Sequence, residues 1–129
     1  DNAGSSQQMN GKKLMQYCTD FSQRAKQAEN TKEKIHAYYC LGFIGGAVES
    51  QHFISFYGAV KDKAYRKDMP AADFNQLMKK YRLFCLPKNV YFRDLVPVVV
   101  NFGKKHPEVL NYPAGVLVFS ALRHQYPCK

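Results

Sequence analysis

The sequence "AYYCLGFIGGAVES", residues Ala37–Ser50, predicts a buried central helix. It is apolar on nearly every side of a helical wheel, which is typical of a helix surrounded by other elements. Each of its three glycines costs up to about 1 kcal/mol relative to alanine in a helix. We therefore expect neighbouring backbone to come close at Gly42, Gly45 and Gly46. Helical spacing continues past Gln51, so the helix either runs on or restarts through Phe53, Phe56, Tyr57 and Val60.

Amphipathic segments on both sides of this stretch predict further helices. One follows the capping residue Asn10, with apolar positions at Leu14, Tyr17, Cys18 and Phe21. Another follows Pro70, with apolar positions at Phe74, Leu77, Met78 and Tyr81. The last follows Pro113, with apolar positions at Ala114, Leu117, Val118, Ala121 and Leu122.

The segment "VPVVV", Val96–Val100, fits a strand and a helix equally well by composition. Pro97 argues against a central strand because proline cannot donate a ladder hydrogen bond. We predict a helix that starts late or kinks at Pro97. The chain is then all-α: a compact bundle of five or six helices pinned by two disulfides. Its 129 residues suit one domain, 10–129, preceded by a flexible N-terminal arm over 1–9.

The four cysteines form an even set without a C-x-x-C pair, which favours two disulfides in an oxidising compartment such as a periplasm. Four buried reduced thiols are the alternative. Cys18 and Cys40 each lie eleven positions from a turn near Glu29, so antiparallel helices bring them level. Cys85 and Cys128 lie twenty-two and twenty-one positions from a turn near Pro107. We predict the bridges Cys18–Cys40 and Cys85–Cys128.

The chain begins at Asp1 without a basic and apolar leader, which a removed export signal or a trimmed chain would each explain. Its formal net charge of +9 would suit nucleic acid, an anionic membrane surface or an acidic protein. Most lysines and arginines fall on the polar sides of helical patterns, which indicates solvated faces. We expect no nucleic-acid partner, and no apolar run is long enough for membrane insertion.

Residues with catalytic chemistry do not combine into a site. His36 and Cys40 are one helical turn apart, as a dyad would be, but Cys40 has a predicted disulfide partner and no third group orients His36. Zinc would require closer cysteine clusters. The "GFIGG" segment lacks the strand that precedes a phosphate-binding loop. We therefore predict a protein that is not an enzyme and that holds no metal and no cofactor.

Two stretches carry a pattern of spaced residues. The first is C-x-G-[YF]-[IL]-x-G in one helix, here Cys40, Gly42, Phe43, Ile44 and Gly46. The second runs from F-C-x-P through a valine-rich helix and H-P-E to a closing aromatic-P-C. Its residues are Phe84, Cys85, Pro87, Val98–Val100, His106, Pro107, Glu108, Ala121, Leu122, Tyr126, Pro127 and Cys128. Together the two stretches resemble a known family, the Rap/Tai group of immunity proteins that neutralise type VI secretion amidase effectors. Tyr91, where a Ser or Thr cap is expected, and Pro97 depart from the family's pattern.

The resemblance implies an exported, all-helical, often dimeric inhibitor in the periplasm of a Gram-negative bacterium. It would bind its cognate peptidoglycan amidase effector and occlude the Cys/His active site. A secreted, disulfide-stabilised helical carrier of an apolar ligand is the alternative.

Contacts with an effector should come from exposed loops. The candidates are Tyr57, Lys61, Lys63, Tyr65, Arg66 and Asp68, with Lys104, Lys105 and His106 in a second turn. An ordinary solvated connector would also fit the first group. The glycine face of the central helix could mediate a homodimer or internal packing.

Overall fold

The computed structural model describes residues 9–24 and 31–129. Over this part of the chain the fold is all-α, with five α-helices, one 3-10 helix and no strand. In order they are α2 (Gly11–Arg24), α3 (Thr31–Lys61), α4 (Ala71–Lys79), α5 (Phe92–Lys105), η1 (Pro107–Asn111) and α6 (Ala114–Gln125). The predicted arm lies outside the described residues except for Met9, whose carbonyl accepts a 2.8 Å bond from the Ala114 N–H.

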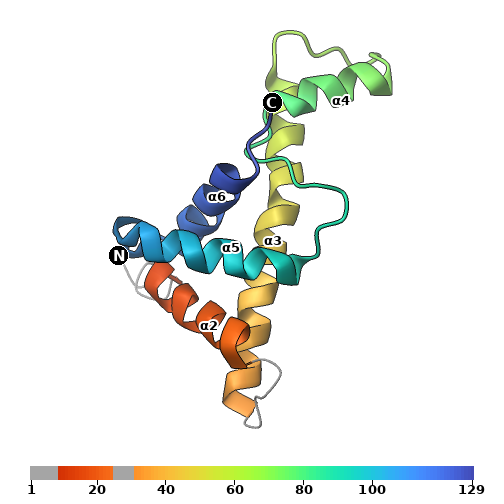
Figure 1. Cartoon of the computed structure of the whole chain (residues 1–129). Coiled ribbons are helices and arrows are strands. Elements are labelled where there is room, and N and C mark those ends of the chain that lie inside the picture. Colours follow the sequence, from red (N-terminus) through yellow and green to blue (C-terminus); the bar gives the residue numbers. More distant parts are fainter. Residues whose placement is uncertain (1–8, 25–30) are drawn as a thin grey trace, which may run out of the picture.

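Helix α3 is the longest of the described helices, and each of the other α-helices packs against it (Figure 1). It runs on past Gln51 without a break, and its 31 residues extend about 46 Å at 1.5 Å per residue. Helices α2, α5 and α6 pack against one another and against α3. Helix α4 packs on the far end of α3, where it projects beyond the other helices (Figure 1).

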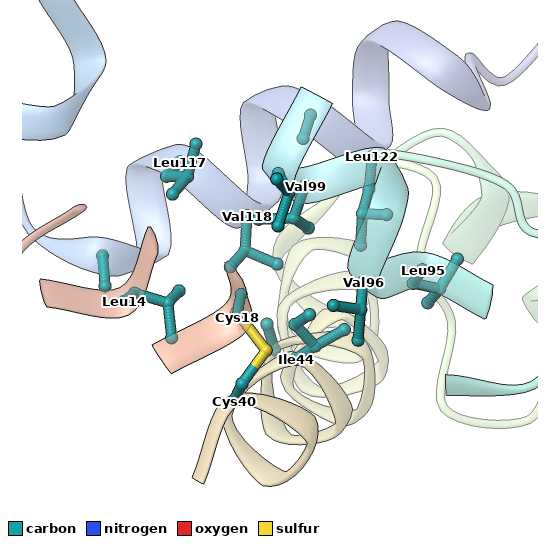
Figure 2. Close-up of a cluster of buried hydrophobic side chains, with 14 of the residues drawn as sticks. Leu14, Cys18, Cys40, Ile44, Leu95, Val96, Val99, Leu117, Val118 and Leu122 are labelled. Atoms are coloured by element: carbon teal, nitrogen blue, oxygen red, sulfur yellow. A yellow bond between two sulfur atoms is a disulfide. The ribbon is translucent and has the colours of Figure 1, made fainter. Parts of the chain in front are cut away.

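The core lies where α2, α5 and α6 meet α3 (Figure 2). Full burial of each Leu, Ile or Val side chain contributes roughly 1.5–3 kcal/mol, which makes this cluster the main source of stability. Its fully buried members include Leu14, Ile44, Leu95, Val96, Val99, Leu117, Val118 and Leu122.

Both predicted disulfides are present. Cys18–Cys40 lies inside the core and joins α2 to α3 (Figure 2). Cys85–Cys128 joins the segment before α5 to the end of the chain, and the Cys85 N–H donates a 2.8 Å bond to the Tyr126 carbonyl beside it. The second bridge therefore closes the open end of the α5–α6 hairpin, as the spacing predicts.

Of the two predicted alternatives for α5, the late start is wrong, and a kink at Pro97 stays a prediction. The helix begins at Phe92, five residues before Pro97, and does not start late. The Asp94 carboxylate accepts a 3.1 Å bond from the Tyr91 N–H, and the Tyr91 carbonyl accepts a 2.9 Å bond from the Asp94 N–H. These bonds fix the first turn. Pro97 then removes one helical bond on an exposed face, where water can satisfy the freed carbonyl.

The central helix is not buried all round. Its exposed residues include Ile35, Tyr38, Tyr39, Phe53, Ile54, Phe56 and Tyr57. The predicted close approach of neighbouring backbone is wrong at all three glycines: at Gly45 the close neighbour is a side chain, and an added Cβ would lie 2.9 Å from the ring of Phe92. Added Cβ atoms at Gly42 and Gly46 would meet nothing within 4 Å. Two of the three glycines therefore face open space.

Candidate partner-binding site

Five aromatic side chains form a continuous row from the end of α3 to α4, and we call this row the aromatic ladder. Its successive ring centroids lie 5.3–5.9 Å apart, in the order Phe53, Tyr57, Phe56, Phe74 and Tyr65. The three members on α3 are 64%, 51% and 48% exposed in that order. Large aromatic side chains at this exposure are typical of a binding surface.

The three ladder residues on α3, Phe53, Phe56 and Tyr57, line a hollow of about 340 Å³ together with His52. A second hollow of about 410 Å³ lies in the connector between α3 and α4, where its lining includes Lys63, Arg66 and Asp68. The apolar row and the charged hollow thus occupy the same end of the molecule.

Sequence-predicted contact residues meet at this end. Tyr57 and Lys61 lie on the last turns of α3, and Lys63, Arg66 and Asp68 are exposed in the connector. Tyr65 is half-buried because its ring packs on Phe74. From Tyr57 to Arg82 the chain carries seven lysines and arginines against three aspartates. The surface is therefore basic as well as aromatic.

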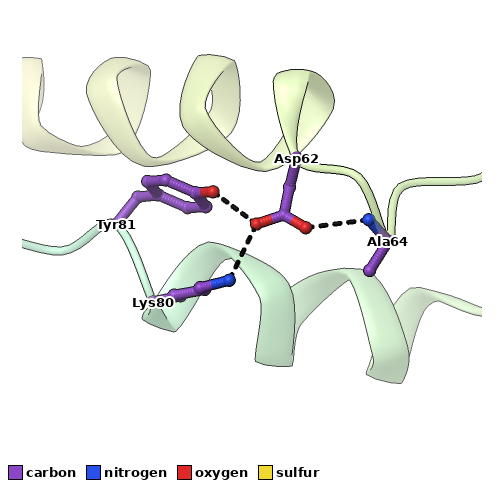
Figure 3. A network of polar contacts seen from close by, with 4 residues as sticks. All are labelled: Asp62, Ala64, Lys80 and Tyr81. Carbon is purple, nitrogen blue, oxygen red and sulfur yellow. Dashed lines mark hydrogen bonds and ion pairs between the residues drawn. The ribbon is translucent and has the colours of Figure 1, made fainter.

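A polar cluster lies where α4 and the connector meet the end of α3 (Figure 3). It consists of Asp62, Ala64, Lys80 and Tyr81, and we call it the Asp62 clamp. The Asp62 carboxylate accepts hydrogen bonds from the Tyr81 O–H, from the Ala64 N–H at 2.8 Å and from the Lys80 Nζ at 3.0 Å. The Asp62 side chain is only 8% exposed, whereas that of Lys80 is 65% exposed. The clamp joins the end of α3 to the two residues that follow α4.

These contacts hold Asp62 in its charged form. The bond from Tyr81, followed by those from Ala64 and Lys80, lowers the pKa of Asp62 to about 2. The bond to Asp62 raises the pKa of both Lys80 and Tyr81. Because the folded pKa of Asp62 is below its ordinary value of 3.8, its stabilising effect is complete above that value. The effect is lost as the pH falls toward 2.

Gly58 makes room for the clamp. An added Cβ at Gly58 would lie 2.5 Å from the ring of Tyr81, so the ring lies directly on the helix backbone one turn before Asp62. Beyond the clamp, the buried Gln51 Oε1 accepts bonds of 2.9 and 2.8 Å from the N–H groups of Leu83 and Phe84. The segment after α4 is therefore fixed to α3 at two levels.

The second predicted contact group lies elsewhere. Lys104, Lys105 and His106 are at the C-terminal end of α5, away from α4 (Figure 1). The His106 ring packs 4.3 Å from that of Phe102, and its Nδ1 is 3.5 Å from Glu108 Oε2. A hollow of about 260 Å³ beside them also includes His124. The structure therefore separates the predicted contacts into two surfaces.

Sequence reasoning missed part of the first surface. Helical spacing through Phe53 and Phe56 predicts a helix but not which of its sides is exposed, and Tyr81 enters only as an apolar position of the helix after Pro70. The available signal is Tyr57, a predicted contact that lies one helical turn after Phe53 and is exposed. No spacing rule links Asp62 with Tyr81, which are 19 residues apart.

His36 and Cys40, which the sequence analysis considered as a dyad, both make structural contacts. The expectation that no third group orients His36 is wrong, because its Nδ1 lies 3.5 Å from Asp20 Oδ2 and its ring stacks on Tyr17 at 4.1 Å. Cys40 is in a disulfide, as predicted. Within the ranges that the structure covers, no group of three His, Cys, Asp or Glu residues is arranged to hold a metal ion. No described helix is long and apolar enough to cross a membrane.

Comparison with known proteins gives one result that covers nearly the whole chain. Residues 10–128 match the family model described as Rap1a immunity proteins. Searches of curated proteins and of solved structures found no significant match.

Proposed function

The chain belongs to the Rap1a immunity protein family, and from this membership we propose that it neutralises a peptidoglycan amidase delivered by a type VI secretion system. An immunity protein acts by binding a cognate toxin, and the amidase is the target that the motif resemblance suggests. We place the encounter in the periplasm because an oxidising compartment maintains two disulfides. On this proposal the protein blocks the amidase stoichiometrically and catalyses nothing itself.

The observation that carries the proposal is the exposed aromatic ladder at a projecting end of the molecule. The end of α3 and α4 extend beyond the bundle of α2, α5 and α6, so this end can enter a groove on a partner (Figure 1). Phe53, Phe56 and Tyr57 supply exposed apolar area, and Arg66 supplies an exposed guanidinium in the connector that follows α3. A body of this shape would occlude a Cys/His active site by filling the groove above it.

Charge supports the same surface. The excess of lysine and arginine between Tyr57 and Arg82 would attract a groove with an acidic rim and speed the encounter. We therefore assign the main contact to the aromatic ladder and its connector, with the α5 end as the lesser candidate.

The test mixes the purified protein with its cognate peptidoglycan amidase effector and measures hydrolysis of peptidoglycan peptides. Hydrolysis should stop near a one-to-one ratio. Phe56→Ala and Arg66→Ala should each weaken inhibition about tenfold or more, as loss of a hot-spot residue does. Lys104→Ala, which removes one charge from the other surface, is the matched control and should inhibit normally.

Three outcomes contradict this proposal in different ways. Full hydrolysis at excess inhibitor rejects the amidase as the target. Loss of inhibition by Lys104→Ala alone moves the contact to the α5 end. Displacement of a fluorescent fatty-acid probe without any inhibition would favour the carrier alternative. The aromatic hollow does not support that alternative, because Phe53 in it is 64% exposed and would not enclose a ligand.

We also propose that two copies associate through the first half of α3. Ile35, Tyr38 and Tyr39 are exposed there, and Gly42 and Gly46 continue the same face at helical spacing. The two open glycines would let a second helix approach closely. Glu49, with its side chain 71% exposed, separates this face from the aromatic ladder.

Sedimentation equilibrium checks the association. The wild-type protein should give the mass of two chains at micromolar concentration, and Gly46→Arg should give the mass of one. Gly115→Arg is the matched control because an added Cβ at Gly115 on α6 also meets nothing within 4 Å. A single-chain mass for the wild type, or a dimer that Gly46→Arg leaves intact, would contradict the assignment.

A further inference from the structure

We propose that the Asp62 clamp is a positioning device, which holds the connector and α4 in the shape that the partner binds. The inference rests on the proposed function, because it assigns a role to residues behind the contact surface. Asp62, Lys80 and Tyr81 are positioning residues on this account, and Gly58 is the site on which the Tyr81 ring lies.

The clamp is placed where it can control a whole segment. Between Asp62 and Tyr81 the chain leaves α3, turns through the connector and returns along α4. This segment, residues 62–81, carries four of the predicted contacts, Lys63, Tyr65, Arg66 and Asp68. It also carries Phe74, which packs on Tyr65 in the aromatic ladder. Bonds between its two ends therefore restrict all of these side chains together.

Little else in the segment anchors it to the core. Helix α4 has nine residues, none of them buried, and packs only on the end of α3 among the described elements. An isolated helix this short is marginal in water, so its order depends on tertiary contacts. The nearest core anchor is the pair of bonds from Leu83 and Phe84 to Gln51, just beyond the clamp.

The hydrogen bonds of the clamp favour one fixed arrangement of residues 62–81. The nearly buried Asp62 carboxylate accepts three donors from three directions, one of them the charged Lys80. Loss of one donor would loosen the segment without opening the core, whose last member on α3 is Val48, fourteen residues before Asp62. A loosened segment must be ordered again when the partner binds, and that ordering costs affinity.

The experiment measures two quantities for each variant: amide hydrogen exchange across residues 62–81 in the free protein, and the dissociation constant for the cognate amidase. Tyr81→Phe keeps the ring on Gly58 but removes the O–H donor, and Lys80→Met removes the cation at an exposed site. Both should raise exchange in the segment and leave core exchange unchanged. Tyr81→Phe should weaken binding about tenfold, with a smaller loss for Lys80→Met.

Matched variants separate positioning from contact and from charge. Lys79→Met makes the same change in net charge on the neighbouring residue and should leave exchange near the wild-type value, and any affinity that it loses measures the effect of charge alone, which the loss in Lys80→Met should exceed. Lys80→Arg keeps a cationic donor and should restore the binding that Lys80→Met loses. Arg66→Ala should weaken binding without raising exchange, since it removes a contact and not an anchor.

The results that overturn the inference are distinct from those that overturn the proposed function. If the wild-type protein fails to bind the amidase, the proposed function fails and the clamp's role falls with it. If the wild type binds and Tyr81→Phe binds equally well despite faster exchange in residues 62–81, the positioning role alone is wrong. Unchanged exchange in Tyr81→Phe overturns it as well.

Discussion

Glycine residues in this chain look alike in the sequence and differ in what surrounds them. An added Cβ at Gly46 would meet nothing within 4 Å, whereas one at Gly11 would lie 2.8 Å from the Leu110 Cα. The first position tolerates a side chain. The second does not, because backbone on η1 cannot move aside as a flexible side chain can. Sequence reasoning treated the glycines of α3 as one group and could not separate Gly45, which packs on Phe92, from its open neighbours.

Alanine substitution should show this difference. Gly46→Ala should stabilise the protein by about 0.5–1 kcal/mol, because alanine has the higher helix propensity and loses less chain entropy on folding. Gly11→Ala should destabilise it, since α2 would have to move away from η1. Thermal unfolding of dilute samples, in which association is minimal, checks both signs. A lower melting temperature for Gly46→Ala would contradict the open environment of that residue.

The number of helices could be predicted from the sequence, whereas the faces of each helix that are covered by other elements could be predicted less well. Periodicity located α2, α3, α4 and α6, because each has an apolar face that must pack on something. It could not say how far the covering helices reach, so it predicts Tyr57 as an exposed contact but does not identify Phe53 and Phe56 as surface residues. On α5, the rule that proline disfavours a helix interior outweighed a local signal, the cap that Asp94 forms with Tyr91. Asp94 fixes the first turn at Tyr91, well before the ring of Pro97 can interfere.

At the scale of the molecule, the two disulfides were predictable because helical hairpins bring residues level at equal distances from a turn. The predicted connector at the end of α3 proved to be a projecting, basic and aromatic surface. The Asp62 clamp beneath it was not predictable, since it depends on how α4 returns to α3. The two bridges also differ in environment: Cys18 and Cys40 are fully buried, and Cys85 and Cys128 are only partly buried.

Mild reduction of the folded protein should distinguish the bridges. A thiol must reach a sulfur atom to attack it, so Cys85–Cys128 should open first and Cys18–Cys40 only on unfolding. Brief treatment with dithiothreitol, followed by alkylation and peptide mass spectrometry, should label Cys85 and Cys128 alone. Equal labelling of all four cysteines under native conditions would mean that the core opens more readily than its packing indicates.

The bond between Cys85 and Cys128 also determines where the polypeptide finishes in space. It holds the C-terminal end close to α4 and the end of α3 (Figure 1). A purification tag or fluorophore fused after Lys129 would therefore crowd the very surface that should meet the toxin. A biosensor surface loaded through that end would under-report binding, whereas attachment ahead of α2 would leave the approach clear.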